Sequence, residues 1–223
     1  RGLLTRSNIL FAALVAFLLI LPSLATPFFV NFVMTQTLVL GLAAATIVFL
    51  AKYGGMTSLA QFLLFGVAGF MFGNAAQEAG ARGLNLGWHP WASVAFAIVV
   101  TTVIAFVLGA IASRTAGIYF LMLTLVFAVI GYFVFAQIVE ISGPGGITSI
   151  QRPDLLGPPV RLYYAGIVLS LLDYLGFRAV GRTAFGLALQ GVRDDPVRMA
   201  SLGFNVMLHR TLAFTLAGFV AGL

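Results

Sequence analysis

Two short stretches of this sequence carry the polar groups that could do chemistry. The first begins with Gly54 and Gly55 and continues with Thr57, Ser58 and, one helical turn later, Gln61. Glycines let a ligand approach the backbone closely, and the hydroxyl and amide groups supply hydrogen-bond donors. A helix that began here inside a membrane would offer free N–H groups and a positive dipole end to the anionic group of a small solute. The alternative is an ordinary helix cap with small packing residues around it.

The second stretch runs from Arg193 to Gly203 and predicts a short helix with both ends fixed. Asp195 suits the N-cap, Pro196 the first helical position and Gly203 the C-terminal stop. From Pro196 to Leu202 this helix would be about 10 Å long. It is too short to be stable alone but long enough to rest in a groove of a partner. The alternative is a capped loop whose arginines only set the membrane topology.

The other polar groups are isolated. Thr124, within a long apolar run, either lines a solute pathway or bonds to its own preceding helical turn. Asp173 is a candidate for proton or ion coupling, and the alternative is snorkelling or pairing with Arg178. No constellation of side chains indicates catalysis, so no catalytic residue is expected. No metal site is expected either, because the chain has no cysteine and His89 and His209 fall on opposite sides of the membrane.

The elements that position these groups must lie in a lipid bilayer. Of the 223 residues, 61% are apolar and 8% are charged, against about 25% charged residues in an ordinary soluble domain. That composition excludes a soluble globule, and the net charge of +6 is a topology signal and not a sign of nucleic-acid binding. Spans are expected to be helices because no alternating barrel pattern occurs. We predict one all-α polytopic domain over residues 1–223, a helical bundle with about seven spans.

Two of the expected spans are short. The third run rises only about 22 Å, against a hydrocarbon core of about 30 Å. It is either a re-entrant or broken helix, or a tilted span that Gly73–Ala76 complete. The last run has no polar flank, so we expect a truncated chain with further spans beyond Leu223. The apolar runs are Ile9–Ala25, Val30–Ala51, Ser58–Phe72, Pro90–Ala112, Ile118–Ile138, Leu162–Phe177 and Thr211 to the end.

The basic residues indicate the orientation. With the N-terminus in the cytoplasm, nine lysines and arginines lie inside and three lie outside, namely Arg82, Arg152 and Arg161. The positive-inside rule favours this arrangement over its inverse. External loops are then expected at residues 75–89 and 141–161, and the largest cytoplasmic segment at residues 178–210.

Several motifs follow one another in a recognisable order. They are Gly54-Gly55 with Ser58-Leu59, Phe65-Gly66, Gly117-Ile118-Tyr119-Phe120 with Thr124-Leu125, Ser142-Gly143-Pro144-Gly145-Gly146-Ile147, Phe185-Gly186-Leu187-Ala188-Leu189, Gly191-Val192-Arg193-Asp194-Asp195 and Leu202-Gly203-Phe204-Asn205. Their order and spacing, over roughly residues 36 to 223, resemble those of the branched-chain amino acid ABC transporter permeases.

The resemblance implies the permease subunit of a binding-protein-dependent importer in a bacterial or archaeal inner membrane. Such a subunit translocates branched-chain amino acids or a related small solute such as urea, and it is no enzyme. Two cytoplasmic ATPase subunits, a second permease subunit and an external solute-binding protein are the implied partners, with ATP and Mg on the ATPases. No cofactor is expected in this chain, which has no P-loop lysine after a glycine, because Lys52 follows Ala51.

The resemblance also assigns roles to the two polar stretches. Residues 181–207 would form a cytoplasmic coupling segment, whose ATPase contacts would be Arg193, Asp194, Asp195, Pro196, Arg198, Leu202 and Gly203. The substrate pathway would include Gly54, Gly55, Thr57, Ser58, Gln61 and Thr124. The alternative function is an ion-coupled secondary transporter or channel centred on Asp173.

Overall fold

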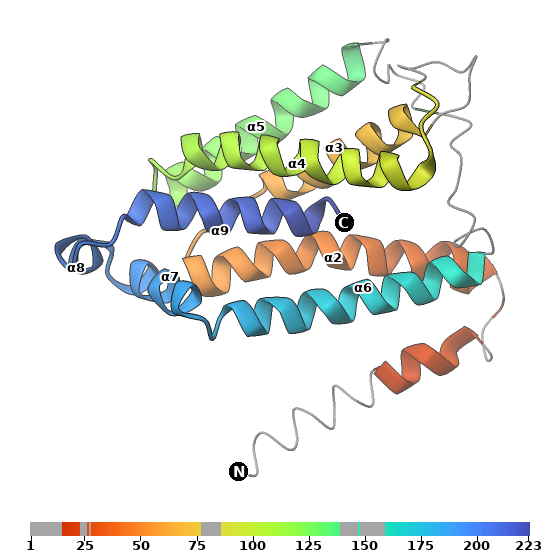
Figure 1. The fold of residues 1–223 in the computed structure, drawn as a ribbon, viewed down its shortest axis with the longest axis horizontal. Helices are drawn as coiled ribbons and strands as arrows, with labels where there is room; N and C mark the ends of the chain where they lie inside the picture. The colour runs from red at the N-terminus through yellow and green to blue at the C-terminus, as the bar shows by residue number, and fades with distance from the viewer. Residues whose placement is uncertain (1–14, 23–25, 27, 77–85, 139–146, 148–158) are drawn as a thin grey trace.

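A computed structural model describes residues 15–22, 26, 28–76, 86–138, 147 and 159–223, and the regular elements in these ranges are all helical (Figure 1). The expected all-α membrane bundle is thereby confirmed. Residues 15–22 form a helical piece. The elements that follow are the π-helix η1 (Phe29–Met34), α2 (Thr35–Phe49), the π-helix η2 (Leu50–Gly54), α3 (Ala60–Ala75), α4 (Pro90–Ala112), α5 (Ile118–Gln137), α6 (Pro159–Val180), α7 (Ala184–Asp194), α8 (Pro196–Ser201) and α9 (Val206–Ala221).

The long helices agree closely with the apolar runs. Within the described residues, four stretches are long and apolar enough to cross a membrane, and α3 and α9 are shorter apolar helices. The predicted bounds of α4 are confirmed at both ends, whereas α6 extends beyond the predicted Leu162–Phe177. Arg161 and Arg178 end an apolar run but do not end a helix, which explains the difference. The four long stretches are Phe32–Gly54, Pro90–Ala112, Ile118–Gln137 and Val160–Val180.

Some predicted features lie outside the described residues. Of the expected first span, Ile9–Ala25, only residues 15–22 are described. Most of the two expected external loops also falls outside, as does the glycine-rich motif apart from Ile147. The cytoplasmic position of the N-terminus stays a prediction.

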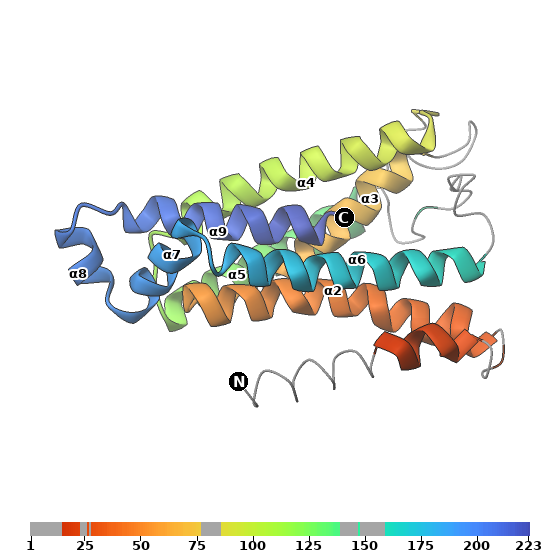
Figure 2. The same cartoon turned by 60° about the horizontal axis from the view of Figure 1, so that its bottom comes forward.

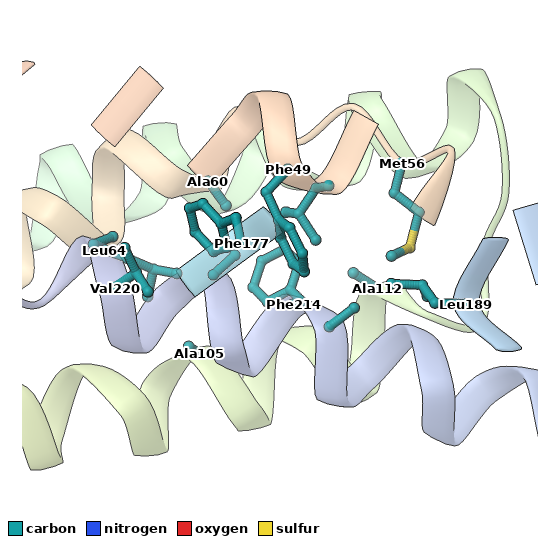
Figure 3. Packing of buried hydrophobic residues seen from close by; sticks show 14 of the residues in the cluster. Phe49, Met56, Ala60, Leu64, Ala105, Ala112, Phe177, Leu189, Phe214 and Val220 are labelled. Carbon is teal, nitrogen blue, oxygen red and sulfur yellow. The ribbon is translucent and has the colours of Figure 1, made fainter. Parts of the chain in front are cut away.

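The helices pack through aromatic contacts and small residues. Phe49 of α2 stacks on Phe177 of α6 with ring centroids 4.4 Å apart, close to Phe214 of α9 (Figure 3). Leu38 of α2 lies against Gly166 of α6. The two residues of this pair are as far apart in the sequence as Phe49 and Phe177, so both helices advance in the same direction. The helices α2 and α6 are therefore parallel neighbours, as Figures 1 and 2 both show. α9 lies between α2 and α4 and contacts both.

The outward faces of the bundle are apolar as well. On α5 only Phe120 and Thr124 are buried, while Ile118, Tyr119 and Tyr132 are largely exposed. Exposed apolar side chains in this density suit lipid and not water.

Gly218 marks the closest approach of α9 to α3 and α4, and it generates a stability prediction. A Cβ at this position would overlap the Cβ of Ala105 and come 3.0 Å from Leu64 Cδ1. We expect Gly218→Ala to destabilise the protein by roughly 1–3 kcal/mol, because it overpacks the junction. The measurement is the apparent Tm of the purified protein in detergent. Gly69→Ala is the control, since a Cβ on Gly69 has nothing within 4 Å; an equal loss in both variants would contradict the packing.

Candidate functional site

The third apolar run forms one continuous helix, α3, which extends through Gly73 to Ala75 as the tilted-span alternative predicts, and a break separates it from η2. The helix formed by α2 and η2 ends at Gly54, and Gly55 closes it in the left-handed conformation with φ of 63°. Residues 55–59 are not helical, and α3 begins only at Ala60. The turn is held at one side by a hydrogen bond from the Met56 N–H to the Leu50 carbonyl at 3.1 Å.

The other side of the turn reaches α5. The Leu59 N–H donates to Thr124 Oγ1 at 3.3 Å, and that hydroxyl donates to the Leu121 carbonyl at 2.9 Å. Thr124 lies six residues after the start of α5, which corresponds to about 9 Å along the helix axis. The N-terminus of α3 therefore lies inside the bundle and not at its end (Figure 1). The structure joins two predicted site regions that are 65 residues apart.

Two side chains at this N-terminus, those of Ser58 and Gln61, are buried and have polar atoms without a hydrogen-bond partner. Ser58, Gln61 and Thr124 each have 0% exposure, whereas Thr57 is exposed. Ser58 Oγ and both amide atoms of Gln61 have no hydrogen-bond partner. A buried polar group without a partner costs about 1–3 kcal/mol, so these groups suit a polar ligand.

Ser58 does not cap α3. The N-cap position belongs to Leu59, which makes no side-chain capping bond. The N–H groups of the first turn of α3 therefore receive no capping oxygen, and the positive end of the helix dipole lies beside Ser58 and Gln61.

Side chains of this chain lie against both glycines at the end of η2, although Gly54 is buried and Gly55 is exposed. A Cβ on Gly54 would come 2.8 Å from Met56 Cε, and a Cβ on Gly55 would come 2.5 Å from Arg193 Cγ. The close approach that these glycines permit is thus made by this chain's own side chains.

The predicted short helix at residues 196–202 is present as α8. The Asp195 carboxylate accepts a hydrogen bond from the Arg198 N–H at 2.9 Å, as an N-cap should, and Pro196 occupies the first helical position. Leu202 is the C-cap, and Gly203 follows with φ of 88°. The prediction from the cap residues is confirmed to within one residue.

α8 projects from one end of the bundle (Figure 1). None of its residues is buried, and Val197 and Leu202 are 75% and 66% exposed.

Sequence reasoning missed α7, which precedes α8. Its N-cap is Thr183, whose side chain accepts from the Gly186 N–H at 3.2 Å. A threonine before an amphipathic run was a usable signal. We call residues 184–203 the α7–α8 hairpin.

Arg193 joins the α7–α8 hairpin to the C-terminal end of η2. Its Nη1 donates to the Lys52 carbonyl, and its Nε donates to Asp194 Oδ1 at 2.8 Å. The hydrogen bond with Asp194 raises the pKa of Arg193, so the guanidinium stays charged. Arg193 and Arg198 are both exposed. No sequence signal indicated the contact with Lys52, which is 141 residues away.

Asp173 is 7% exposed in α6, and its Oδ2 has no hydrogen-bond partner. The expected pairing with Arg178 is wrong: of the described residues, only Arg193 and Asp194 form an ion pair. Asp173 and Phe177 are both buried and lie one helical turn apart, so they share a face of α6, which Arg178, five residues after Asp173, does not. The described ranges hold no group of three or more possible metal ligands of the His, Cys, Asp and Glu types.

Comparison with known proteins places the chain among transport proteins. It matches the family described as "Branched-chain amino acid transport system / permease component" over residues 29–223. Two similar curated proteins are the high-affinity branched-chain amino acid transport system permease proteins LivM of Salmonella typhimurium and Escherichia coli, 26% and 25% identical over 195 residues. These alignments cover 75% of this chain and 46% of each relative, so the chain spans about half their length. No solved structure matches the chain.

The contact between Leu59 and Thr124 generates a prediction. Thr124→Val keeps the side-chain shape but removes the acceptor, leaving the Leu59 N–H unsatisfied at a cost of about 1–3 kcal/mol. We expect faster hydrogen exchange over residues 55–64 and a lower Tm in detergent. Thr102→Val is the control, because the Thr102 hydroxyl bonds only the Ile98 carbonyl of its own helix, at 2.7 Å. Unchanged exchange over residues 55–64 in Thr124→Val would refute the contact.

Proposed function

The chain belongs to the family of branched-chain amino acid transport system permease components. From this premise we propose that it contains the solute site of an ABC importer and the surface that contacts the ATPase subunits. One observation carries the proposal of a solute site. α3 begins within the bundle, without a side-chain cap, beside buried and unbonded polar groups of Ser58 and Gln61.

The chemistry of these groups fits a zwitterionic amino acid. The free N–H groups of α3 and the Ser58 hydroxyl would donate to the carboxylate. The Gln61 amide oxygen is an acceptor for the ammonium group. The adjacent Ala60 and Leu64 belong to the apolar core, which suits an aliphatic side chain. The names of the two relatives support branched-chain amino acids as the solute, and a related small solute is the broader class.

Transport in this proposal requires no chemistry on the solute. Two cytoplasmic ATPase subunits would bind and hydrolyse ATP with Mg, and a second permease subunit and an external solute-binding protein would complete the importer. Closure of the ATPases would shift the population between inward-open and outward-open states. Membership of the permease family supports this mechanism over ion coupling through Asp173.

The surface for the ATPase would be α8. Val197 and Leu202 present apolar side chains beyond the end of the bundle, and Asp195 and Gly203 fix the two ends of the helix. A short helix held in this way keeps its shape when it enters a groove, so little ordering entropy is lost on binding.

The solute site predicts the effect of removing one donor. We expect Ser58→Ala to raise the amino acid concentration for half-maximal uptake about tenfold, because no water or lipid replaces the lost bond. Thr57→Val should have a smaller effect, since the Thr57 side chain is exposed. The measurement is uptake of radiolabelled leucine into proteoliposomes holding the complete transporter. Ser170→Ala is the control, because the Ser170 hydroxyl bonds the Gly166 carbonyl at 2.8 Å. Wild-type kinetics for Ser58→Ala would remove the site.

The docking surface predicts a loss of assembly. We expect the double variant Val197→Asp with Leu202→Asp to lose co-purification of the ATPase subunits by about tenfold or more, since two charges would enter an apolar contact. The measurement is the ATPase content of the complex pulled down through the permease. Leu86→Asp is the control, because Leu86 is also exposed but lies four residues before the start of α4, at the other end of the bundle. Full assembly of the double variant would exclude α8 as the docking element.

A further inference from the structure

The α7–α8 hairpin is held together from within. A Cβ on Gly191 of α7 would come 2.8 Å from the sulfur of Met199 on α8, so the Met199 side chain lies directly over the backbone of α7. The N–H of Asp195, which lies between the two helices, also donates to the Gly191 carbonyl at 3.0 Å. A force on α8 is therefore transmitted to α7 through packed atoms and not through a flexible linker.

α7 is in turn fixed to the end of η2 by two side chains one helical turn apart. Leu189 is fully buried and lies 3.8 Å from the position of a Cβ on Gly54. Arg193 lays its aliphatic stem over Gly55 and donates to the Lys52 carbonyl. That carbonyl is one of the last of the helix, where intrahelical partners are missing, so a charged donor there bonds strongly.

The same turn is held weakly on its other side. Its link to α5 is the bond from the Leu59 N–H to Thr124 Oγ1, whose 3.3 Å exceeds the usual N–H···O range of about 2.7–3.2 Å. Ser58, between the two ends, makes no side-chain bond. We therefore expect the weaker link to open first when α7 moves relative to α5, so that the turn follows α7.

We propose that Arg193 is a positioning residue that fixes the α7–α8 hairpin to the turn at residues 55–59, so that the two move together as a rigid unit. Displacement of α8 then moves Ser58 and the uncapped end of α3 away from Thr124, which changes the solute site directly. The inference rests on the proposed function for the identity of the solute. It assigns Arg193, which sequence reasoning placed against the ATPase, to an internal contact.

The first test compares two arginine variants in the complete transporter reconstituted in proteoliposomes. Arg193→Ala should keep its ATPase subunits and their ATP hydrolysis but lower leucine uptake per ATP about tenfold. Arg182→Ala is the matched control, because Arg182 is an exposed arginine just before α7 with no side-chain bond among the described residues. Wild-type uptake per ATP in Arg193→Ala would overturn the inference, as would loss of the ATPase subunits from that variant.

The second test restores the link covalently. The chain has no cysteine, so the double variant Gly55→Cys with Arg193→Cys contains a single possible disulfide. The Cβ positions are 3.4 Å apart, close to the lower end of the disulfide range of about 3.5–4.5 Å. The reduced form should show the defect of Arg193→Ala, and oxidation should restore uptake per ATP. Gly55→Cys alone controls for backbone strain and should not respond to oxidation. If the oxidised double variant had uptake per ATP as low as the reduced one, the proposal that the hairpin and the turn move together would be contradicted.

A readout without the solute separates this inference from the proposed function. In the wild-type complex, ATP binding should change hydrogen exchange over residues 55–64, and Arg193→Ala should abolish that change while Arg182→Ala keeps it. If the wild type took up no leucine but showed this pattern, the proposed solute would be refuted and the link through Arg193 would be supported. An ATP-induced change that persists in Arg193→Ala would refute the link, whatever the solute.

Discussion

The break between η2 and α3 at residues 55–59 leaves backbone N–H and C=O groups without partners in a helix, and this part of the fold depends on how the protein replaces those partners. Here the Met56 N–H returns to Leu50, the Leu59 N–H reaches Thr124 and the Lys52 carbonyl receives Arg193. Each bond comes from a different neighbour, so η2, α5 and α7 must all be in place before the break is tolerated. The positions of these three elements follow from this requirement.

The position at which α3 begins also explains why polar groups are concentrated at one depth. A helix that began at the end of the bundle would place its first N–H groups there. Because α3 begins inside the bundle, its first N–H groups lie there without a capping side chain. Ser58 and Gln61 add unbonded polar atoms beside them. Unsatisfied groups of this kind are tolerated only where surrounding packing is tight. The tight contacts of Gly218 with Ala105 and Leu64 supply such packing between α3, α4 and α9.

How far the sequence predicts the structure depends on how local each interaction is. The bounds of α4 and the caps of α8 were predictable because Pro90, Asp195 and Gly203 act within one helical turn of their own positions. The bonds of Leu59 with Thr124 and of Arg193 with Lys52 join residues far apart, and no pattern within either segment specifies them. The start of α3 at Ala60 was open for the same reason, because it depends on the bond between Leu59 and Thr124.

Gly55 shows how one residue can serve both local and tertiary structure. The Gly54-Gly55 pair suggested room for a solute, and the stem of Arg193 lies against Gly55. Two constraints act on Gly55 together: a φ of 63°, which ends η2, and contact with the Arg193 stem, which leaves no space for a Cβ. The first is local and the second tertiary. Because both fall on one residue, the end of the helix and the attachment of the α7–α8 hairpin cannot vary independently. A solute site next to this glycine is therefore linked to the hairpin by the backbone itself.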